Sequence, residues 1–464
     1  FHAGTSITTG KESIFIGGLA GDAYTSGSFN VGMGYIALTS DTLGQYNTAL
    51  GYAALATQNF TTSTNSYNTA VGANAGLVLT TGIQNVLVGA GAGDALTDAD
   101  NNTALGAFSL SADTKGDKSV AVGVVALASQ NFTTVTDTFN TAVGYSAGSA
   151  VTTGVQNTLV GGRAGDALTD ADFNTAVGER SLSADTLGSK STAIGSLALN
   201  QQNFTTATDT FNTAVGFQAG TAVTTGVQNT LVGGLAGDAM TVGQNNVAIG
   251  VTALTSDVGG SRTVAIGRGA LENQNMGSSD TNSHNTAVGY GAGATVTTGI
   301  DNTFIGALAG DGTNDGTENV AVGKSALSGN CGDNNTAVGK DSLEVTTGED
   351  NTALGMSAGK SISTGNRNTV IGHDVATSLQ GGSDNVAIGD SVDVAASLGN
   401  SITIGSGISA TGSNDFSFGK ASNVVTNDFD ADANWSRSSD QRLKKNITDQ
   451  TLGLSFINDL RTVK

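Results

Sequence analysis

Proline is absent from the 464 residues, cysteine occurs once, and charged residues make up only 12%, about half of the usual ~25%. Because Cys331 is the single cysteine, no disulfide can form within the chain. The three histidines stand far apart, so neither a metal site nor a cofactor is expected. No stretch approaches the ~20 apolar residues of a membrane-spanning helix, so no membrane insertion is expected.

The charge that is present is mostly negative, with a net value of -20. A phosphate backbone requires a basic protein face, so this balance argues against a nucleic-acid partner. It also argues against attachment to anionic membrane surfaces. Low charge and few aromatic residues are compatible with disorder, but apolar residues at strictly fixed intervals are not.

Those intervals come from one short motif, Asn-Thr-Ala-Val-Gly, which begins at Asn140 and recurs along nearly the whole chain. Counting the first residue of every exact or variant copy gives 24 anchors, from Ser13 to Asp415. Most of the intervals between them equal the step from Asn140 to Asn157, and the others are slightly shorter or longer. A period this short and constant predicts a solenoid, in which each repeat buries its apolar face against its neighbours.

Each coil is predicted to contain two short strands and two turns. In the coil that starts at Asn140, the first strand is 141–143, the second includes 146–147, and 152–154 turns toward the next anchor. Stacking at the ~4.8 Å strand spacing would make 24 coils roughly 115 Å long. Identical side chains would lie above one another, so the Asn anchors could form a hydrogen-bonded ladder.

The first strand is predicted to be covered on both faces. Alternation places Thr141 and Val143 on one face and Ala142 on the other, and both faces are small or apolar. One face would line the narrow interior of the coil, which suits Ala and Gly. The other face would meet a second chain, so the sequence predicts an oligomer.

A longer period of four coils relates Asn68, Asn140 and Asn212. Each of these anchors follows a lengthened coil that carries Asn-Phe-Thr-Thr, and insertions in solenoids form loops on one face. The phenylalanines, Phe60, Phe132 and Phe204, have two interpretations. We favour the one in which each folds back over the end of its widened coil; the other is a row of surface contacts about 19 Å apart.

A second recurring element is rich in aspartate, as in Asp94-Ala-Leu-Thr-Asp98-Ala-Asp100. Carboxylates at alternate positions could bind calcium. The stretch lacks the glycine and distal glutamate of a helix–loop–helix calcium site and the repeat of calcium-binding β-rolls. Solvated turn residues are therefore the preferred interpretation.

Four parts of the chain are predicted: a lead-in at 1–12, the repeat fibre at 13–419, a connector at 420–438 and a distinct segment at 439–464. Phe418 is bulkier than earlier residues at its place in the coil, which suits a terminal cap. In the last segment, apolar residues recur with the spacing of a helix, at Leu452, Leu454, Ile457 and Leu460.

The iterated Asn-Thr-Ala-Val-Gly motif resembles the head repeats of YadA-type trimeric adhesins, over about residues 13–419. In that family each chain is a left-handed parallel β-roll, and three rolls pack about a common axis. The resemblance implies an all-β, left-handed parallel β-solenoid of about 24 coils in a homotrimeric fibre.

The stretch Ser439-Asp-Gln-Arg-Leu-Lys-Lys-Asn-Ile447 resembles the start of the endosialidase-type intramolecular chaperone domain of phage tail fibres and tailspikes. In that family the domain drives trimerisation and then cuts itself off before the serine. The resemblance implies Ser439 as nucleophile and Lys444 as its base, with cleavage of the Ser438–Ser439 bond. It also assigns Asp440, Arg442 and Asn446 to the motif. A lysine can deprotonate a serine hydroxyl once burial lowers its pKa.

Together these features predict a homotrimeric virion fibre, such as a phage tail fibre or another appendage, that mediates attachment to a host cell. The expected partners are further copies of the chain, a baseplate or other attachment protein, and a host surface receptor, with glycans among the candidates. The alternative is a bacterial cell-surface adhesin of the same fold. No external substrate is expected, because a depolymerase needs paired carboxylates in a groove, whereas the Asp-rich loops recur with the repeat.

Overall fold

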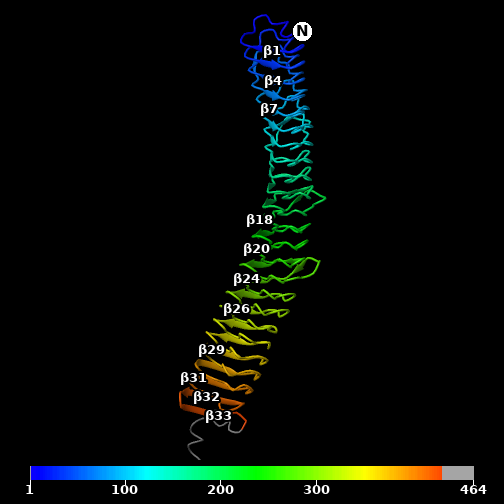
Figure 1. Cartoon of the computed structure of the whole chain (residues 1–464). Coiled ribbons are helices and arrows are strands. Elements are labelled where there is room, and N and C mark those ends of the chain that lie inside the picture. The colour runs from blue at the N-terminus through cyan, green and yellow to red at the C-terminus, as the bar shows by residue number, and fades with distance from the viewer. Residues whose placement is uncertain (1, 431–464) are drawn as a thin grey trace, which may run out of the picture.

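The computed structural model describes residues 2–430. Every regular element in this range is a strand, and the range contains no helix that could span a membrane. The strands form a long, gently bent rod whose coils follow one another in chain order from the N-terminal end (Figure 1). The predicted all-β solenoid is confirmed.

One sheet of 25 strands runs the length of the rod. All its neighbouring strands pair in parallel except the last two, which are antiparallel. Each of the 24 predicted anchors is the first residue of one of the parallel strands or the residue directly before it. In order, the strands are β1 (Ile14–Ile16), β2 (Val31–Met33), β4 (Thr48–Leu50), β6 (Thr69–Val71), β7 (Val86–Val88), β8 (Thr103–Leu105), β10 (Val120–Val122), β12 (Thr141–Val143), β13 (Thr158–Val160), β14 (Thr175–Val177), β16 (Thr192–Ile194), β18 (Thr213–Val215), β19 (Thr230–Val232), β20 (Val247–Ile249), β22 (Val264–Ile266), β24 (Thr286–Val288), β25 (Thr303–Ile305), β26 (Val320–Val322), β27 (Thr336–Val338), β28 (Thr352–Leu354), β29 (Thr369–His373), β30 (Val386–Asp390), β31 (Ile402–Ser406), β32 (Asp415–Lys420) and β33 (Asn423–Asp428).

The eight remaining strands form four two-stranded parallel sheets at the lengthened coils. Each pair joins the end of the preceding coil to the inserted loop of the lengthened coil. The pairs are β3 (Gly44–Gln45) with β5 (Thr64–Asn65), β9 (Gly116–Asp117) with β11 (Thr136–Asp137), β15 (Gly188–Ser189) with β17 (Thr208–Asp209), and β21 (Gly260–Ser261) with β23 (Thr281–Asn282). Near β18 and β24 the lengthened coils protrude from the rod (Figure 1).

The predicted second strand of each coil is wrong. We number each coil from its anchor, so Asn140 is position 1, and positions 5–11 of this coil form turns, not a strand. Ser146 and Gly148, at positions 7 and 9, have φ of 55° and 58°, a left-handed conformation that cannot continue a strand. The turns still bond from coil to coil, since the Gly148 N–H donates to the Ala164 carbonyl at 2.9 Å.

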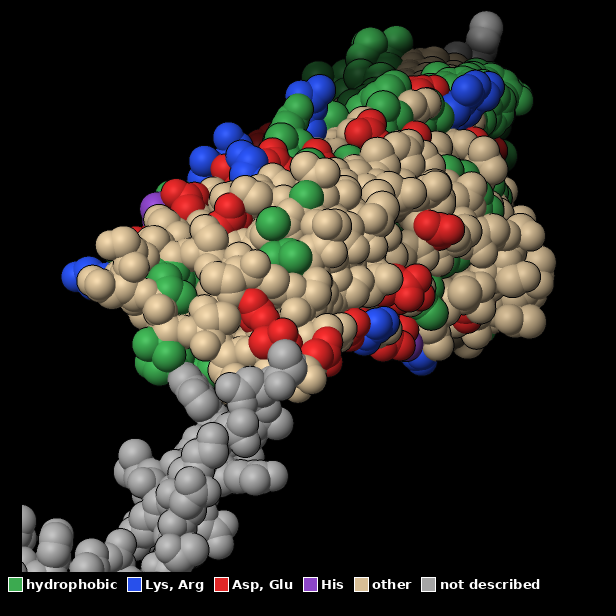
Figure 2. Space-filling model, turned by 90° about the horizontal axis from the view of Figure 1, so that it is seen from below, with side chains coloured by type: hydrophobic (Ala, Val, Ile, Leu, Met, Phe, Trp, Pro, Cys, Tyr) green, Lys and Arg blue, Asp and Glu red, His purple; other side chains and the backbone are tan. Residues whose placement is uncertain are grey.

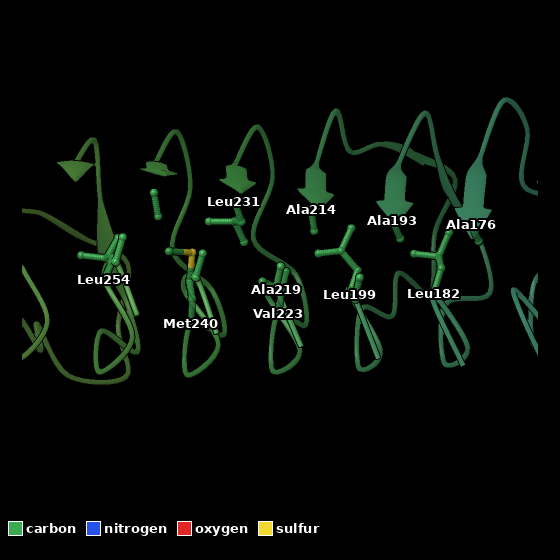
Figure 3. Close-up of a cluster of buried hydrophobic side chains, with 14 of the residues drawn as sticks. Ala176, Leu182, Ala193, Leu199, Ala214, Ala219, Val223, Leu231, Met240 and Leu254 are labelled. Carbon is green, nitrogen blue, oxygen red and sulfur yellow. The ribbon is translucent and has the colours of Figure 1, made fainter. Parts of the chain in front are cut away.

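The interior is built from small residues on the sheet and larger ones opposite it. Ala142 and Ala147, at positions 3 and 8, are fully buried, and so is Val151 at position 12. Figure 3 shows the same arrangement farther along, with alanines of the sheet above and Leu182, Val223 and Met240 facing them from the turns.

A large side chain at position 3 leaves no room for a side chain at position 9. Leu159 occupies position 3 in place of the usual alanine and is fully buried. A Cβ at Gly148 would lie 2.6 Å from Leu159 Cδ1, and one at Gly165 would lie 2.8 Å from Leu159 Cδ2. Position 9 is therefore glycine both in the coil with a large position 3 and in the coil before it, as at Gly165 and Gly148. It is leucine at Leu182, where position 3 is alanine in the same coil and in the next one.

The predicted Asn ladder exists, but its hydrogen bonds mostly involve the backbone. Asn140 Oδ1 accepts a hydrogen bond from the backbone N–H of Asn157 at 2.9 Å, and the pattern repeats in the following coils. Within its own coil, Asn140 Nδ2 donates to the Gly154 carbonyl at 2.7 Å. Each buried Asn thus joins two coils and closes its own turn, which satisfies groups that would be costly to bury alone.

The C-terminal end of the described rod differs from the predicted connector. Strand β33 folds back on β32 in antiparallel register, with Phe418 opposite Val425. Residues 423–428, which the sequence placed in the connector, therefore cover the edge of the last coil. Strand β33 thereby replaces the last coil as the terminal strand of the sheet.

Candidate functional site

The outward face of the main sheet carries exposed apolar side chains along the rod. Ala142 points inward, while the residues before and after it are half-buried and point outward. Where the outward residue is large, much of it is exposed, as at Leu105 (46%) and Ile249 (37%). Such a contiguous row marks an interaction surface more often than a free one. Further members are Ile16, Met33, Val86, Ile194, Ile305, Leu354 and Ile404.

The rest of the surface is mostly uncharged and polar. Viewed from below, the visible face is dominated by polar groups and backbone, with charged and apolar side chains scattered among them (Figure 2). Residues 2–430 contain no group of three His, Cys, Asp or Glu side chains able to hold a metal ion. The calcium interpretation of the Asp-rich loops therefore gains no support from the geometry.

The aspartates that follow Ala-Gly fall into two groups. Asp22 Oδ1 accepts a hydrogen bond from the Thr39 hydroxyl of the next coil at 2.7 Å. At Asp94, Asp166 and Asp311 the next coil has serine in place of threonine, and the buried Oδ1 has no partner. Desolvation raises the pKa of these three carboxyls above its ordinary value.

The phenylalanines of the lengthened coils are buried. Phe60, Phe132 and Phe204 are only 6%, 7% and 7% exposed. This matches the interpretation in which each ring covers the end of its widened coil. The three rings cannot form a row of surface contacts, because they have almost no accessible area.

A buried polar cluster that the sequence analysis missed organises each lengthened coil. Asp113 is fully buried; its Oδ2 accepts from Gln130 Nε2 at 2.5 Å, and its Oδ1 accepts from the Phe132 N–H at 3.0 Å and the Gly116 N–H at 3.1 Å. Gln130 Oε1 accepts from Asn140 Nδ2 at 2.9 Å, which connects the cluster to the Asn ladder. The signal was an aspartate followed by glutamine at the same position of the next coil, at Asp41, Asp113, Asp185 and Asp257.

One edge of the main sheet carries exposed aromatic and basic residues just before the anchors. Lys118 Nζ lies 2.6 Å from Asp137 Oδ2 and 5.2 Å from the centre of the Phe139 ring. The arrangement recurs four coils later at Lys190, Asp209 and Phe211. Nearer the N-terminus the same edge carries stacked Phe29, Tyr46 and Tyr67 rings.

The other edge of the sheet, after the strand-ending glycine, contains a pocket of about 170 Å³. Tyr290 stands beside it and is 56% exposed, and the Arg268 guanidinium carbon lies 5.9 Å from the centre of its ring. The lining residues are Thr252, Arg268, Gly269, Glu272, Tyr290, Gly291, Ala294 and Leu308. Sequence reasoning missed this pocket, although two successive glycines at position 7 signal it.

The residues predicted for self-cleavage, Ser439 and Lys444, lie outside the described residues, as do Asp440, Arg442 and Asn446. Cys331 is buried, and its Sγ lies 3.1 Å from Thr313 Oγ1. Burial raises the pKa of its thiol to about 11, which makes it a packing residue and not a nucleophile.

No family model matches the chain, and no curated protein matches it.

Proposed function

We propose that this protein is a structural fibre of a virion, a tail fibre or similar appendage, and that it attaches the particle to a host cell surface. The observation that carries the proposal is the unbroken stack of coils with one apolar outer face. A rod of this kind separates its two ends and presents a repeated lateral surface, and it needs no catalytic cleft.

The apolar face supports assembly into a homotrimer. Each coil encloses a narrow core made largely of alanine, so a single chain buries little apolar area per residue. Three copies packed by their sheets about a common axis would cover the exposed residues of all three, and rotational symmetry would close the assembly. The number three rests on the resemblance of residues 13–419 to the trimeric adhesin repeats.

The C-terminal motif supports the virion assignment and a single self-cleavage. Lys444 would take the proton of the Ser439 hydroxyl, and the oxygen would attack the carbonyl carbon of Ser438. The C–N bond would break as that proton passes to the nitrogen, leaving an ester. Water would then hydrolyse the ester to a Ser438 carboxylate and the Ser439 hydroxyl.

Two measurements on the expressed chain test assembly and cleavage. Light scattering on the purified protein should give three times the chain mass, and a monomer would overturn the trimer. Intact mass under denaturing conditions should show wild type ending at Ser438, while Ser439→Ala stays whole. If wild type also stays whole, the self-cleavage assignment is wrong.

The sheet face can be tested by adding charge to it. Leu105→Asp combined with Ile249→Asp should convert the trimer to monomer, because the buried face would then hold unpaired carboxylates. Val135→Asp is the matched control, since Val135 is 61% exposed on an inserted loop away from this sheet. Equal dissociation of both proteins would show that the sheet face is not the interface.

The runner-up is a bacterial surface adhesin, which the same repeats support. Immunogold labelling separates the two proposals, because a virion fibre should be labelled on purified particles and an adhesin on the cell envelope.

A further inference from the structure

The pocket beside Tyr290 interrupts a regular rod. Position 7 of most coils carries a side chain, such as Thr252 or Leu308 on either side of the pocket. Gly269 and Gly291 are the only two successive glycines at this position among the 24 coils. Two missing side chains, one above the other, leave the hollow.

At both glycines, only the end of a side chain that lines the pocket lies close to where a Cβ would stand. The nearest atom to a Cβ at Gly269 would be Glu272 Oε2, at 3.1 Å, and at Gly291 it would be Leu308 Cδ2, also at 3.1 Å. Gly91 occupies the same position in another coil, but there the Phe108 ring lies within 2.8 Å and fills the space. A lone glycine at position 7 therefore does not make a pocket.

Other coils also carry an exposed aromatic residue at the position of Tyr290 and can be compared with this one. Tyr145 and Phe217 occupy position 6 of their coils, as Tyr290 does, and are 57% and 56% exposed. Beside Tyr145, position 7 holds Val125 and Ser146 in place of the two glycines. An exposed aromatic ring thus recurs along this edge, but only the coils at Tyr290 combine it with paired glycines.

The pocket has an apolar side and a polar rim. Tyr290, Ala294 and Leu308 contribute apolar surface, while Thr252, Arg268 and Glu272 contribute hydrogen-bonding groups. Among residues 2–430, no ion pair or side-chain hydrogen bond engages the Arg268 or Glu272 side chain. Both therefore remain available to a ligand, as in sites where a few polar groups orient a molecule against apolar walls.

The volume of the pocket and the charges of its lining residues limit the kind of ligand that it can bind. A volume of about 170 Å³ is below the ~300–1,000 Å³ of pockets for drug-sized molecules, so it suits a single ring. Arg268 and Glu272 carry opposite charges, which favours a neutral ligand rich in hydroxyls. A pyranose ring fits, because it has an apolar C–H face and a rim of hydroxyl groups.

We propose that the pocket formed by Gly269, Gly291, Tyr290, Arg268 and Glu272 binds one neutral sugar ring of a cell-surface glycan. The inference rests on the proposed attachment function and names its ligand class. The pocket lies beyond the glycine that ends each strand, at an edge of the sheet and not on its outward face. A trimer would then present three such pockets at one level of the fibre, which raises avidity for a glycan-bearing surface.

Saturation-transfer NMR on the full-length fibre tests the pocket directly. The probes are the methyl glycosides of glucose and galactose, N-acetylglucosamine and, as the acidic sugar, sialic acid. Wild type should transfer saturation to at least one neutral sugar, and Tyr290→Ala should weaken that binding at least tenfold. Tyr145→Ala is the matched control and should bind as wild type does.

Gly269→Asn fills the pocket with little backbone strain. Asn74 already occupies position 7 of its own coil with φ of 61°, close to the 65° of Gly269, and asparagine tolerates this conformation. The variant should remain trimeric and lose the sugar signal. Unchanged sugar binding in Gly269→Asn, no neutral-sugar binding in wild type, or a preference for sialic acid would each overturn the proposal.

Adsorption of the labelled fibre to host cells separates failure of the pocket from failure of the proposed function. Fibre that adsorbs equally well as wild type and as Gly269→Asn, with no sugar signal, would retain attachment and overturn the pocket. Fibre that binds a neutral sugar only with an open pocket, yet never adsorbs to cells, would support the pocket and overturn attachment as the function.

Discussion

Regular and lengthened coils fill the same interior position with opposite chemistry. In the regular coils that begin at Asn140 and Asn157, position 12 is Val151 and Leu168, both fully buried. At the insertion, position 12 is Asp113 in one coil and Gln130 in the next, and both are again fully buried. The difference follows from the backbone, because an inserted loop leaves N–H groups that no neighbouring coil can satisfy.

The polar pair therefore specifies where the solenoid widens. Asp113 accepts the N–H groups of Phe132, inside the loop, and Gly116, before the coil begins. A carboxylate buried without a basic partner is tolerated when hydrogen bonds satisfy its oxygens. Polar groups left without partners lie mainly in regular coils, as at Asp94 and Thr403.

Removing the carboxylate should have the largest effect. Asp113→Ala removes one of the two acceptors of Gln130 Nε2, which keeps Ser119 Oγ at 2.8 Å, and leaves two backbone N–H groups unsatisfied inside the rod. We therefore expect the free energy of unfolding to fall by about 3 kcal/mol or more. Urea denaturation measures the loss, and limited proteolysis should show cleavage within 131–138. Asp98→Ala is the control; Asp98 is solvent-accessible, with Lys115 Nζ 3.7 Å away, and should change stability by less than about 0.5 kcal/mol. Equal losses would mean that Asp113 does not hold the loop.

The regular coils should be most sensitive at position 9. Gly148 has φ of 58° and would place a Cβ 2.6 Å from Leu159 Cδ1, so Gly148→Ala should cost about 2 kcal/mol through strain and overpacking. Gly162→Ala is the matched control, because a Cβ there meets no atom within 4 Å. Thermal unfolding followed by circular dichroism compares them, and a destabilised Gly162→Ala would contradict this account of the core.

The repeat made the solenoid predictable, because apolar spacing and anchor count depend only on sequence. It also gave the register and the inward face, since every strand repeats the alternation seen at Ala142. The second strand was predicted wrongly because left-handed residues such as Ser146 are not glycine, asparagine or aspartate, so nothing in the local sequence marks them. The pocket at Gly269 escaped notice because it depends on side chains missing from adjacent coils, which becomes visible only when the coils are stacked.

Replacing a buried polar group that has no hydrogen-bond partner should stabilise the protein. Thr403 is fully buried at position 3, and its hydroxyl has no hydrogen-bond partner within residues 2–430. Val370 occupies position 3 two coils earlier, so valine fits there. Thr403→Val should raise the free energy of unfolding by about 1 kcal/mol, measured by urea denaturation. Thr134→Val, at an exposed position of an inserted loop, is the control and should stay within about 0.5 kcal/mol of wild type.

The smallest expected effect is a pH dependence carried by Asp94 and Asp166. Desolvation raises their folded pKa above the ordinary value of 3.8. Their contribution to stability is therefore fully present below pH 3.8 and is lost as the pH rises through the folded pKa. When the pH is raised from about 4 to about 7, the double variant Asp94→Asn/Asp166→Asn should lose less folding stability than wild type does.

The matched control for this titration is Asp22→Asn/Asp238→Asn, which changes the net charge by the same amount. These aspartates accept hydrogen bonds from Thr39 and Thr255 of the next coil, so the control removes two negative charges without removing an unpartnered carboxyl oxygen. Urea midpoints at the two pH values give the comparison. If both double variants flatten the profile equally, the dependence comes from the overall negative charge, and the missing threonine partner at Asp94 and Asp166 has no energetic consequence.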